Sequence, residues 1–190
     1  MKYTIRQLTC PMEVIVAQRL LHDDYRYNQK WEPLPGNPSN ARYLNGRLRD
    51  DFEDKAIWFG AYYKGELIGS LRIIPGELEL ARYTTFVGYT DRDAEVNRMV
   101  IRPEHQGSSV LTLLGLWSYF YLLRNGYSRM WGSPNTRIAM KSLRYGWKDT
   151  GIRFKYNTVD TMECALIYLP VSIKTCILLF IRIAISRLLY

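Results

Sequence analysis

The stretch EVNRMVIRPEHQGSSV, residues 95–110, has the composition of a β-strand that runs into a turn and then into a helix. The apolar run Met99–Ile101 precedes Pro103, and a Gln-Gly-Ser-Ser turn follows directly before a strongly apolar segment that ends near Arg124. A turn between a strand and a helix presents successive backbone N–H groups, and the positive end of the helix dipole also favours an anion. We therefore expect an anionic or amide-rich ligand at this turn.

The remaining sequence predicts a mixed α/β (α+β) domain, in which a mostly antiparallel sheet is flanked by helices. The expected helices are 11–25, 107–124 and 135–145, and the expected strands are 3–7, two runs joined at Lys64-Gly65, 95–102, 127–133, 152–159 and 163–171. Residues 31–50 contain three prolines and two glycines and are expected to be irregular. We assign residues 1–170 to one domain and residues 171–190 to a separate C-terminal helical tail.

The positive charge of the chain is concentrated in one segment. Between Arg102 and Lys155 there are nine Lys or Arg residues and two acidic residues, a net charge of +7, whereas residues 1–101 carry fourteen of each sign. A basic face of this kind attracts nucleic acid, anionic lipid or an acidic protein, and the alternative is an ordinary solvated surface.

Around the turn, the sequence resembles the acyl-carrier motif of the GCN5-related N-acetyltransferase superfamily. In that motif a Gln/Arg-x-x-Gly-x-Gly/Ala turn cradles the pyrophosphate of coenzyme A. Gln106 matches the first position, whereas Ser109 and Leu111 stand where two small residues are expected. Side chains at these positions impede the approach of a pyrophosphate to the backbone, which argues against coenzyme A as the natural carrier.

Further residues resemble those of the acyl-homoserine lactone synthases, which share this fold. Those enzymes carry an Asp-x-x-Asp pair, an arginine on the following strands and a Glu-x-Ser-Arg-Phe stretch. The matching positions here are Asp51, Asp54, Arg72, Glu95 and Arg98, while Asn97 and Met99 replace the serine and the phenylalanine.

Over about residues 12–170 the chain is similar to the long-chain N-acyl amino acid synthases, relatives of the lactone synthases typified by enzymes that make N-acyl tyrosines. This resemblance implies an N-acyltransferase that moves a long-chain fatty acyl group to the α-amine of a free amino acid, with tyrosine as one candidate. The donor would be the acyl-phosphopantetheine of an acidic acyl carrier protein, or acyl-CoA, used as a co-substrate with no bound cofactor. The alternatives are an acyl-homoserine lactone synthase, a CoA-dependent N-acetyltransferase, and a basic module that binds nucleic acid or membrane.

The charge distribution fits the acyl carrier protein that the resemblance implies. Carrier proteins are acidic, and they bring one phosphate rather than a buried pyrophosphate to the turn. The residues expected to bind the carrier and its pantetheine arm are Arg102, Gln106, Gly107, Ser108, Ser109, Arg144 and Lys148.

Acyl transfer to an amine requires a base, because the amine must lose a proton as it attacks the thioester. Glu95 is the candidate, and its alternative role is a structural ion pair with Arg72 or Arg98. Backbone N–H groups from Met99 to Ile101 are suited to the thioester oxygen as negative charge develops on it.

Arginine is the residue expected to hold the carboxylate of the amino acid, because its planar fork can bind a carboxylate through two hydrogen bonds. Arg72 and Arg98 are the candidates. By resemblance, Asp51 and Asp54 are expected to form a substrate-orienting or structural network with these arginines. His22 and His105 have no His or Cys partner at ligand spacing, so no metal site is expected.

The tail and the cysteines bear on localisation. Three cysteines without motif spacing suggest reduced thiols in a cytoplasmic protein. Lys174, Arg182 and Arg187 interrupt the apolar tail, so its uncharged runs are too short to span a membrane. The tail is expected either to pack on the body or on a partner subunit, or to lie peripherally on the inner face of the membrane.

Overall fold

The computed structural model describes residues 2–86, 88–157 and 162–188. It contains a seven-stranded mixed sheet with the strand order β1-β4-β5-β6-β7-β9-β8. β6 and β7 are parallel, whereas the pairs β1-β4, β4-β5, β7-β9 and β8-β9 are antiparallel. The predicted α/β class with a mostly antiparallel sheet is therefore confirmed. The chain forms two compact units, Met1–Pro75 with Val96–Phe120 and Gly76–Glu95 with Tyr121–Tyr190.

The first unit is built on three antiparallel strands, β1 (Thr4–Leu8), β4 (Ile57–Tyr63) and β5 (Glu66–Pro75). The predicted hairpin at Lys64-Gly65 is confirmed. Both turn residues have positive φ angles, 49° and 85°, which is the geometry of the tight turns that match the twist of the flanking strands.

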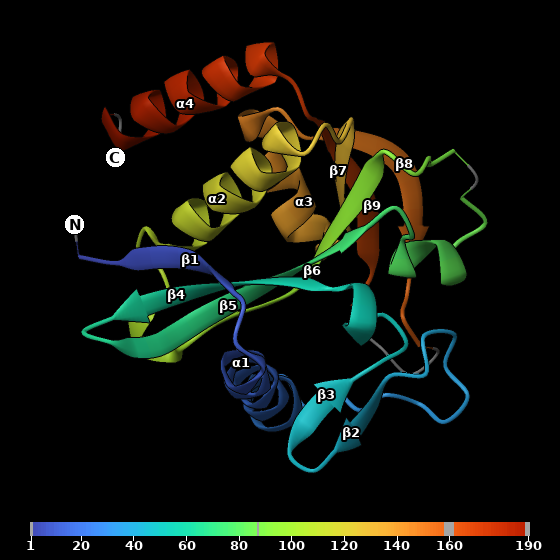
Figure 1. Cartoon of the computed structure of the whole chain (residues 1–190). Coiled ribbons are helices and arrows are strands. Elements are labelled where there is room, and N and C mark those ends of the chain that lie inside the picture. The colour runs from blue at the N-terminus through green and yellow to red at the C-terminus, as the bar shows by residue number, and fades with distance from the viewer. Residues whose placement is uncertain (1, 87, 158–161, 189–190) are drawn as a thin grey trace. The chain divides into compact units, whose positions relative to one another are not determined.

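Helix α1 (Pro11–Asp23) covers one face of these strands (Figure 1). Proline is suited to the first helical position, because the N–H group that it lacks would have no partner in the helix there. Ala17 and Leu21 are buried in a cluster with Leu8 and Trp58. The helix ends in one π-helical turn, Asp24–Asn28, so the predicted end near residue 25 lies within this irregular turn.

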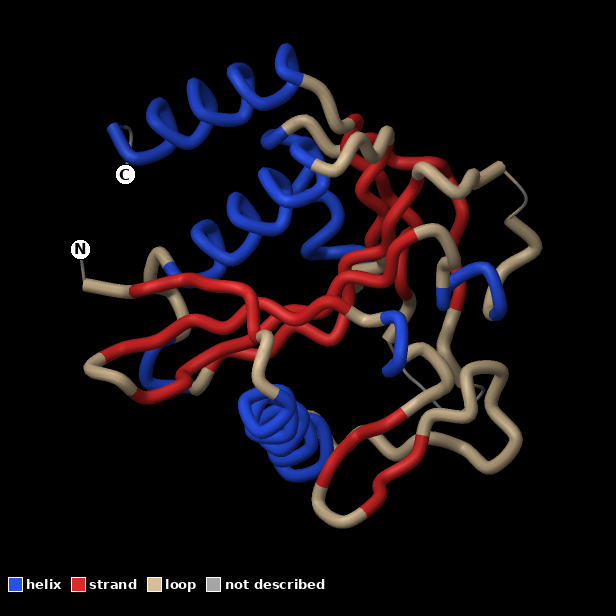
Figure 2. Tube along the Cα trace, viewed as in Figure 1, coloured by secondary structure: helices blue, strands red, loops and turns tan. Residues whose placement is uncertain are grey.

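Residues 31–50 are not entirely irregular. Figure 2 shows a loop followed by two short strands, β2 (Arg42–Leu44) and β3 (Arg47–Arg49), which pair as a hairpin. The hairpin turns at Asn45-Gly46, with φ angles of 51° and 68°. An Asn-Gly pair is a strong hairpin signal, but strands of three residues are too short to show a period of two.

The quoted stretch folds as predicted into a strand, a turn and a helix. Strand β6 (Asp93–Ile101) precedes a short 3-10 turn (Pro103–His105), and helix α2 (Val110–Arg124) follows. Although the helix is strongly apolar, it is not fully buried: Trp117 is 48% exposed, and Phe120 is also exposed. Helix α2 therefore has a buried side and an open apolar side.

The second unit contains the remaining sheet strands: β7 (Arg129–Gly132), β8 (Lys148–Phe154) and β9 (Cys164–Pro170). Helix α3 (Thr136–Ser142) begins at Asn135, whose side chain accepts a hydrogen bond from the N–H group of Ile138. Trp131 is buried with Leu78, Leu80 and Leu166. Residues 158 and 159 of the predicted strand 152–159 lie outside the described residues.

Helix α4 (Ile173–Leu188) forms most of the predicted tail, whose last two residues also lie outside the described part of the chain. Among residues 2–86, 88–157 and 162–188, no helix combines the length and hydropathy needed to cross a membrane. The boundary at residue 170 between a domain and a tail stays a prediction.

Candidate functional site

A buried network of charged side chains lies in the first unit, with Arg72 of β5 at its centre. The Arg72 side chain is fully buried, and its Nη1 donates to Asp50 Oδ1 at 2.8 Å and to Glu53 Oε1 at 3.1 Å. Its Nε donates to the side-chain oxygen of Asn97 on β6 at 2.8 Å. Buried charges of opposite sign that are paired and hydrogen-bonded offset the cost of removing them from water.

Arg98 extends this network, because its Nη2 donates to Asp50 Oδ2 at 3.1 Å. The two arginines are therefore joined by the two oxygens of one carboxylate. Burial opposes the charged form of Asp50, but the Arg72 and Arg98 guanidinium groups outweigh it and lower the pKa of this carboxyl. For Glu53 burial prevails over the attraction of Arg72, and its pKa is raised. We call Asp50, Glu53, Arg72 and Arg98 the arginine network.

Local structure explains why these acids turn inward. Asp50 follows β3 and accepts a hydrogen bond from the N–H group of Phe52 at 2.9 Å, which closes a tight turn. The 3-10 turn Glu53–Lys55 then directs Glu53 toward Arg72 and toward Gln18 of α1, whose Nε2 donates to Glu53 Oε2 at 2.6 Å.

The acids of this network are not the pair that the sequence predicted. Asp51 and Asp54 are both exposed, and Asp51 accepts a hydrogen bond from Asn40 at 2.8 Å. The carboxylates that bind Arg72 are those of Asp50 and Glu53, each one residue before a predicted acid. The predicted acid–arginine network exists, but the assignment of its acids requires correction by one position.

Strand β6 is irregular at Arg98, which has a φ angle of 49°. A residue other than glycine in this left-handed region costs on the order of 1 kcal/mol, so the conformation must be held by its surroundings. The ion pair with Asp50 and the stacking of the guanidinium carbon 5.6 Å from the Trp31 ring centroid are two such restraints. The next residue, Met99, is exposed, and Ile101 is half-buried.

The turn after β6 is ordered by its own polar groups. The Gln106 side chain donates to the carbonyl oxygen of Ile101 at 3.0 Å, and Ser108 Oγ donates to the carbonyl oxygen of His105 at 2.6 Å. Gly107 has a φ angle of 73° and open space where a side chain would begin. The Ser109 carbonyl accepts the first hydrogen bond of α2, from Leu113. Arg102 forms an ion pair with Glu66 at 2.6 Å.

Glu95 lies in the second unit, on β6 beside Trp131 of β7. It is fully buried, and its Oε2 accepts a hydrogen bond from the N–H group of Leu80 at 2.9 Å. Leu80 belongs to the 3-10 turn Glu79–Arg82, so one role of this carboxylate is to hold that turn.

Tyr156, which the sequence analysis did not single out, lies within the electrostatic influence of Glu95. The Tyr156 hydroxyl is 2.5 Å from Ser133 Oγ, and the Tyr156 ring contacts those of Tyr83 and Phe154. Burial, followed by the negative charges of Glu95 and Glu79, raises the pKa of Tyr156 well above its ordinary value. Tyr156 therefore stays protonated at neutral pH and is able to donate a proton or a hydrogen bond.

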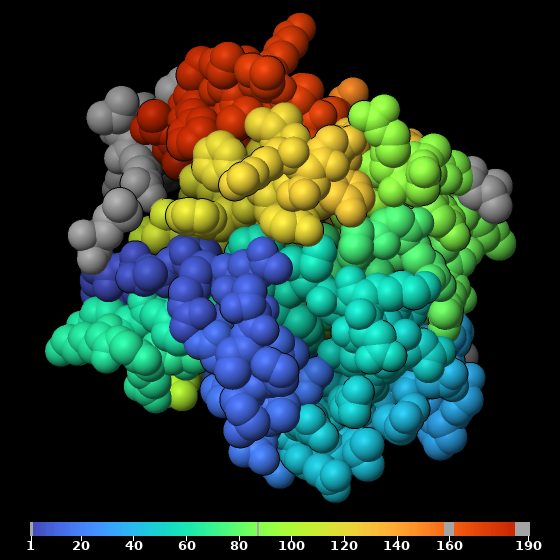
Figure 3. Space-filling model, in the orientation of Figure 1, coloured from blue at the N-terminus to red at the C-terminus, as the bar shows by residue number. Residues whose placement is uncertain are grey.

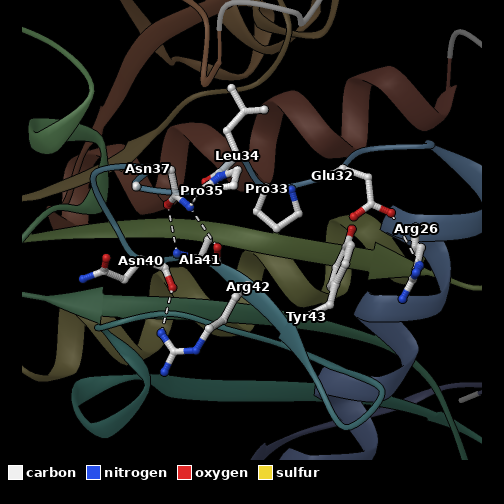
Figure 4. A pocket seen from close by; sticks show the side chains of 11 residues that line it. Arg26, Glu32, Pro33, Leu34, Pro35, Asn37, Asn40, Ala41, Arg42 and Tyr43 are labelled. Atoms are coloured by element: carbon white, nitrogen blue, oxygen red, sulfur yellow. Dashed lines mark hydrogen bonds and ion pairs between the residues drawn. The ribbon is translucent and has the colours of Figure 1, made fainter.

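A cleft of about 460 Å³ opens in the first unit between the end of α1 and the β2 strand (Figure 4). Its lining includes two guanidinium groups, Arg26 and Arg42, together with Glu32 and Tyr43. Arg26 pairs with Glu32 at 3.5 Å, whereas the hydrogen bond of Arg42 is to the carbonyl oxygen of Asn40 at 3.2 Å. Asn37 holds the loop by donating to the carbonyl oxygens of Leu34 and Ala41.

The cleft is connected to the arginine network through aromatic rings. Tyr43 lines the cleft and contacts Trp31 edge-on at 6.5 Å, and the guanidinium of Arg98 lies over the Trp31 ring. The Tyr43 hydroxyl also donates to the carbonyl oxygen of Trp31. A ligand in the cleft would therefore lie one aromatic layer from Arg98.

The basic segment divides into paired and exposed side chains. Arg102, Arg129 and Arg153 form ion pairs with Glu66, Asp93 and Asp149. Arg144 and Lys148, the predicted carrier-binding pair, are exposed in the second unit. The exposed basic side chains of that unit in this segment are Arg124, Arg137, Lys141, Arg144, Lys148 and Lys155. Within the described ranges no three His, Cys, Asp or Glu side chains are grouped to hold a metal ion.

Solved structures with this fold are known. The chain is similar to BjaI, a CoA-dependent acyl-homoserine lactone synthase solved with SAM and isopentyl-CoA (TM-score 0.76, 16% identity, 96% of this chain and 90% of that chain). It is also similar to the acyl-homoserine lactone synthase LasI (TM-score 0.72, 14% identity, 94% and 93%). FeeM, an N-acyl amino acid synthase from uncultured soil microbes, has a TM-score of 0.66 and 20% identity, with 89% and 91% of the chains covered.

No protein-family model matches the sequence, and no curated protein sequence matches it significantly. At identities of 14–20% the structural likeness establishes the fold. The chain has the mixed α/β fold that acyl-homoserine lactone synthases share with an N-acyl amino acid synthase, so the predicted GCN5-related N-acetyltransferase fold is confirmed.

Proposed function

We propose that the protein is an N-acyltransferase that moves a long-chain acyl group from a thioester to the α-amine of a free amino acid. The observation that carries this proposal is the buried carboxylate of Glu95 on the strand that leads directly into the turn at residues 102–109. An amine acceptor needs a base, and a thioester arm needs a turn with backbone donors. One continuous segment of this chain supplies both.

In the proposed reaction, Glu95 takes a proton from the amine, directly or through water, and the amine nitrogen attacks the thioester carbonyl. Backbone N–H groups from Met99 to Ile101 stabilise the negative charge that develops on the carbonyl oxygen. The new C–N bond is complete when the C–S bond breaks and the thiolate leaves. Because a thiol has a pKa near 8.5, the thiolate leaves readily.

The arginine network supports this site indirectly. Arg72 is fully buried and already bound to two carboxylates, which is the environment of a positioning residue rather than of a group that contacts the substrate. Asn97 and Arg98, both on β6, are held by this network. We propose that it holds the irregular part of β6 in the conformation that acyl transfer requires.

We further propose that the amino acid binds in the cleft lined by Arg26 and Arg42. Arg42 is exposed there. Its guanidinium donates a hydrogen bond to the carbonyl oxygen of Asn40, which is a neutral acceptor rather than a carboxylate. A free carboxylate would meet a planar donor at Arg42, and an aromatic side chain would meet Tyr43.

Arg42→Ala should raise KM for the amino acid about tenfold to a hundredfold, because a charge-assisted hydrogen bond contributes about 1.5–3 kcal/mol. The turnover number should change much less, since this contact forms equally in the ground state and the transition state. Steady-state kinetics at saturating acyl donor would measure both. The control is Arg47→Ala on the paired strand β3, which lies outside the cleft lining. Equal effects of the two substitutions would contradict the cleft assignment.

The donor is proposed to be an acidic acyl carrier protein. Arg144 and Lys148 are exposed on the second unit, and together with Arg137 and Lys141 they form a basic surface on one short segment. Such a surface raises the association rate of an acidic partner, and salt weakens the effect. The phosphopantetheine arm is proposed to bind at the turn formed by Gln106, Gly107, Ser108 and Ser109.

Reversing two of these charges tests the carrier. Arg144→Glu with Lys148→Glu should raise KM for acyl carrier protein about tenfold at low salt, and the difference should shrink as salt is added. Activity with a small acyl-pantetheine thioester should stay near that of the parent. The matched control is Arg19→Glu with Lys64→Glu, an identical charge change at exposed positions of the first unit. If both donors lose activity equally, the two residues support the fold rather than the carrier.

A homoserine lactone synthase is the second candidate, because BjaI and LasI have this fold. The two candidates differ in their acceptor. Purified protein should be incubated with acyl carrier protein or CoA thioesters and with either free amino acids or SAM, and the products identified by mass spectrometry. An N-acyl amino acid formed without SAM supports the proposal, whereas a lactone formed only with SAM would replace it. The absence of any acyl transfer would refute both.

A further inference from the structure

Helix α4 of the second unit turns its large apolar side chains toward solvent. Ile173 and Ile177 are 71% and 56% exposed, and Phe180 and Ile181 are also exposed. Their spacing of four, three and one residues places all four on one side of the helix. Figure 3 shows α4 in red at the surface of the molecule. Large exposed apolar patches on a folded protein mark an interaction surface.

The orientation of α4 is fixed by contacts on its other side. Leu179 is buried and Thr175 is half-buried, and the hydroxyl groups of Thr175 and Ser172 form a hydrogen bond of 3.0 Å. The guanidinium of Arg182 lies against Gly146, where an added Cβ would be only 2.6 Å from Arg182 Nη1. These contacts hold the side of the helix that carries Thr175 and Leu179 against the second unit and leave Ile173, Ile177, Phe180 and Ile181 exposed.

The charge of this surface identifies its partner. Lys174 and Arg182 are exposed on α4, and the sequence has no acidic residue after Glu163. Helix α4 also packs beside the 3-10 turn Leu143–Tyr145, which carries the exposed Arg144. A second copy docking through the same face would bring the Lys174 side chains of two chains together with no acid on α4 to oppose them, which disfavours such a dimer.

We propose that α4 binds peripherally to a lipid bilayer that carries anionic headgroups. Ile173, Ile177, Phe180 and Ile181 enter the boundary between headgroups and acyl chains, and Lys174 beside them binds a lipid phosphate. An apolar face beside basic residues is the combination that holds a helix in the plane of such an interface.

Flotation of the full chain with vesicles tests this assignment. The chain should float with phosphatidylcholine vesicles that contain phosphatidylglycerol, and much less with phosphatidylcholine alone, because the basic residues require anionic headgroups. The variant Ile177→Asp with Phe180→Asp should reduce the bound fraction about tenfold or more. The matched control is Met12→Asp with Val16→Asp, which places the same change on exposed residues of α1. Circular dichroism would verify that both variants keep their helix content.

Lys174→Glu separates the electrostatic part from the apolar part. It should weaken flotation with the phosphatidylglycerol vesicles and leave the weak flotation with phosphatidylcholine unchanged. Failure of the native chain to bind anionic vesicles, or equal binding by the α4 and α1 variants, would overturn the proposal. A native dimer that Ile177→Asp dissociates, without vesicle binding, would instead assign this face to a second copy.

Discussion

Glu95→Gln should reduce turnover by about 10² to 10⁴, because the amide cannot accept the proton that the amine must lose. The substitution is well matched to the structure. Glutamine keeps an oxygen that can accept the hydrogen bond from the Leu80 N–H group, so the 3-10 turn Glu79–Arg82 should persist. The measurement is single-turnover acyl transfer at saturating substrates, with thermal unfolding to verify that the variant is folded.

Two controls distinguish a base from a structural carboxylate. The first control is Glu77→Gln, the same chemical change at a partly exposed glutamate that forms an ion pair with Arg82. This variant should keep near-normal turnover. Raising the pH should restore part of the activity of Glu95→Gln, since more of the amine is then deprotonated without help from the protein. A folded Glu95→Gln variant with normal turnover, or a loss that pH does not alter, would remove Glu95 from the proton transfer.

Arg72→Met should destabilise the protein by about 3–5 kcal/mol at neutral pH, because it leaves buried carboxylates without their main counter-charge. Asp50 would keep Arg98, but Glu53 would lose its ion pair. Urea denaturation would measure the change in the free energy of unfolding. Arg82→Met is the matched control, because Arg82 forms a partly exposed pair with Glu77 and should cost at most about 1 kcal/mol.

A second substitution tests the reason for this loss. Arg72→Met combined with Glu53→Gln should recover at least about 1 kcal/mol, since it removes one of the carboxylates left without a partner. If the double variant is less stable than the sum of the single changes predicts, the destabilisation comes from packing rather than from charge.

The two acids of the arginine network should respond to pH in opposite directions. The lowered pKa of Asp50 means that its contribution to stability is present above its ordinary value of 3.8 and is lost as the pH falls through the lowered pKa. The raised pKa of Glu53 means that its contribution is present below its ordinary value of 4.5 and is lost as the pH rises through the raised pKa. Asp50→Asn should therefore flatten the acid limb of the stability curve, and Glu53→Gln should flatten the limb above pH 4.5.

Local chemistry explains which elements could be predicted from the sequence. Lys64-Gly65 lies between two long β-rich runs, so the turn and both strands were evident. Asn45-Gly46 is an equally good turn, but its flanking strands of three residues are too short for a periodic signal. Strand β6 and helix α2 were predicted because a long apolar helix follows a proline and a glycine-containing turn.

The acids of the site were harder to predict, because the segment RDDFED contains two overlapping pairs. Asp50 with Glu53 and Asp51 with Asp54 have the same spacing, and only burial distinguishes them. The direction of the chain after β3 decides which pair meets Arg72, and no local pattern encodes it. Tyr156 and Glu79 were missed for the same reason, since each reaches its neighbours only through tertiary packing.

The arginine network also constrains how the sequence can diverge. Two positive and two negative side chains neutralise one another inside the protein, so losing any one of them leaves an uncompensated charge. A lineage that replaces one member must pass through a less stable intermediate unless a second replacement arrives with it. We therefore expect substitutions at these four positions to be tolerated in pairs and rejected singly. A library that randomises all four codons together, selected for folded protein, would show this as covariation among the recovered sequences.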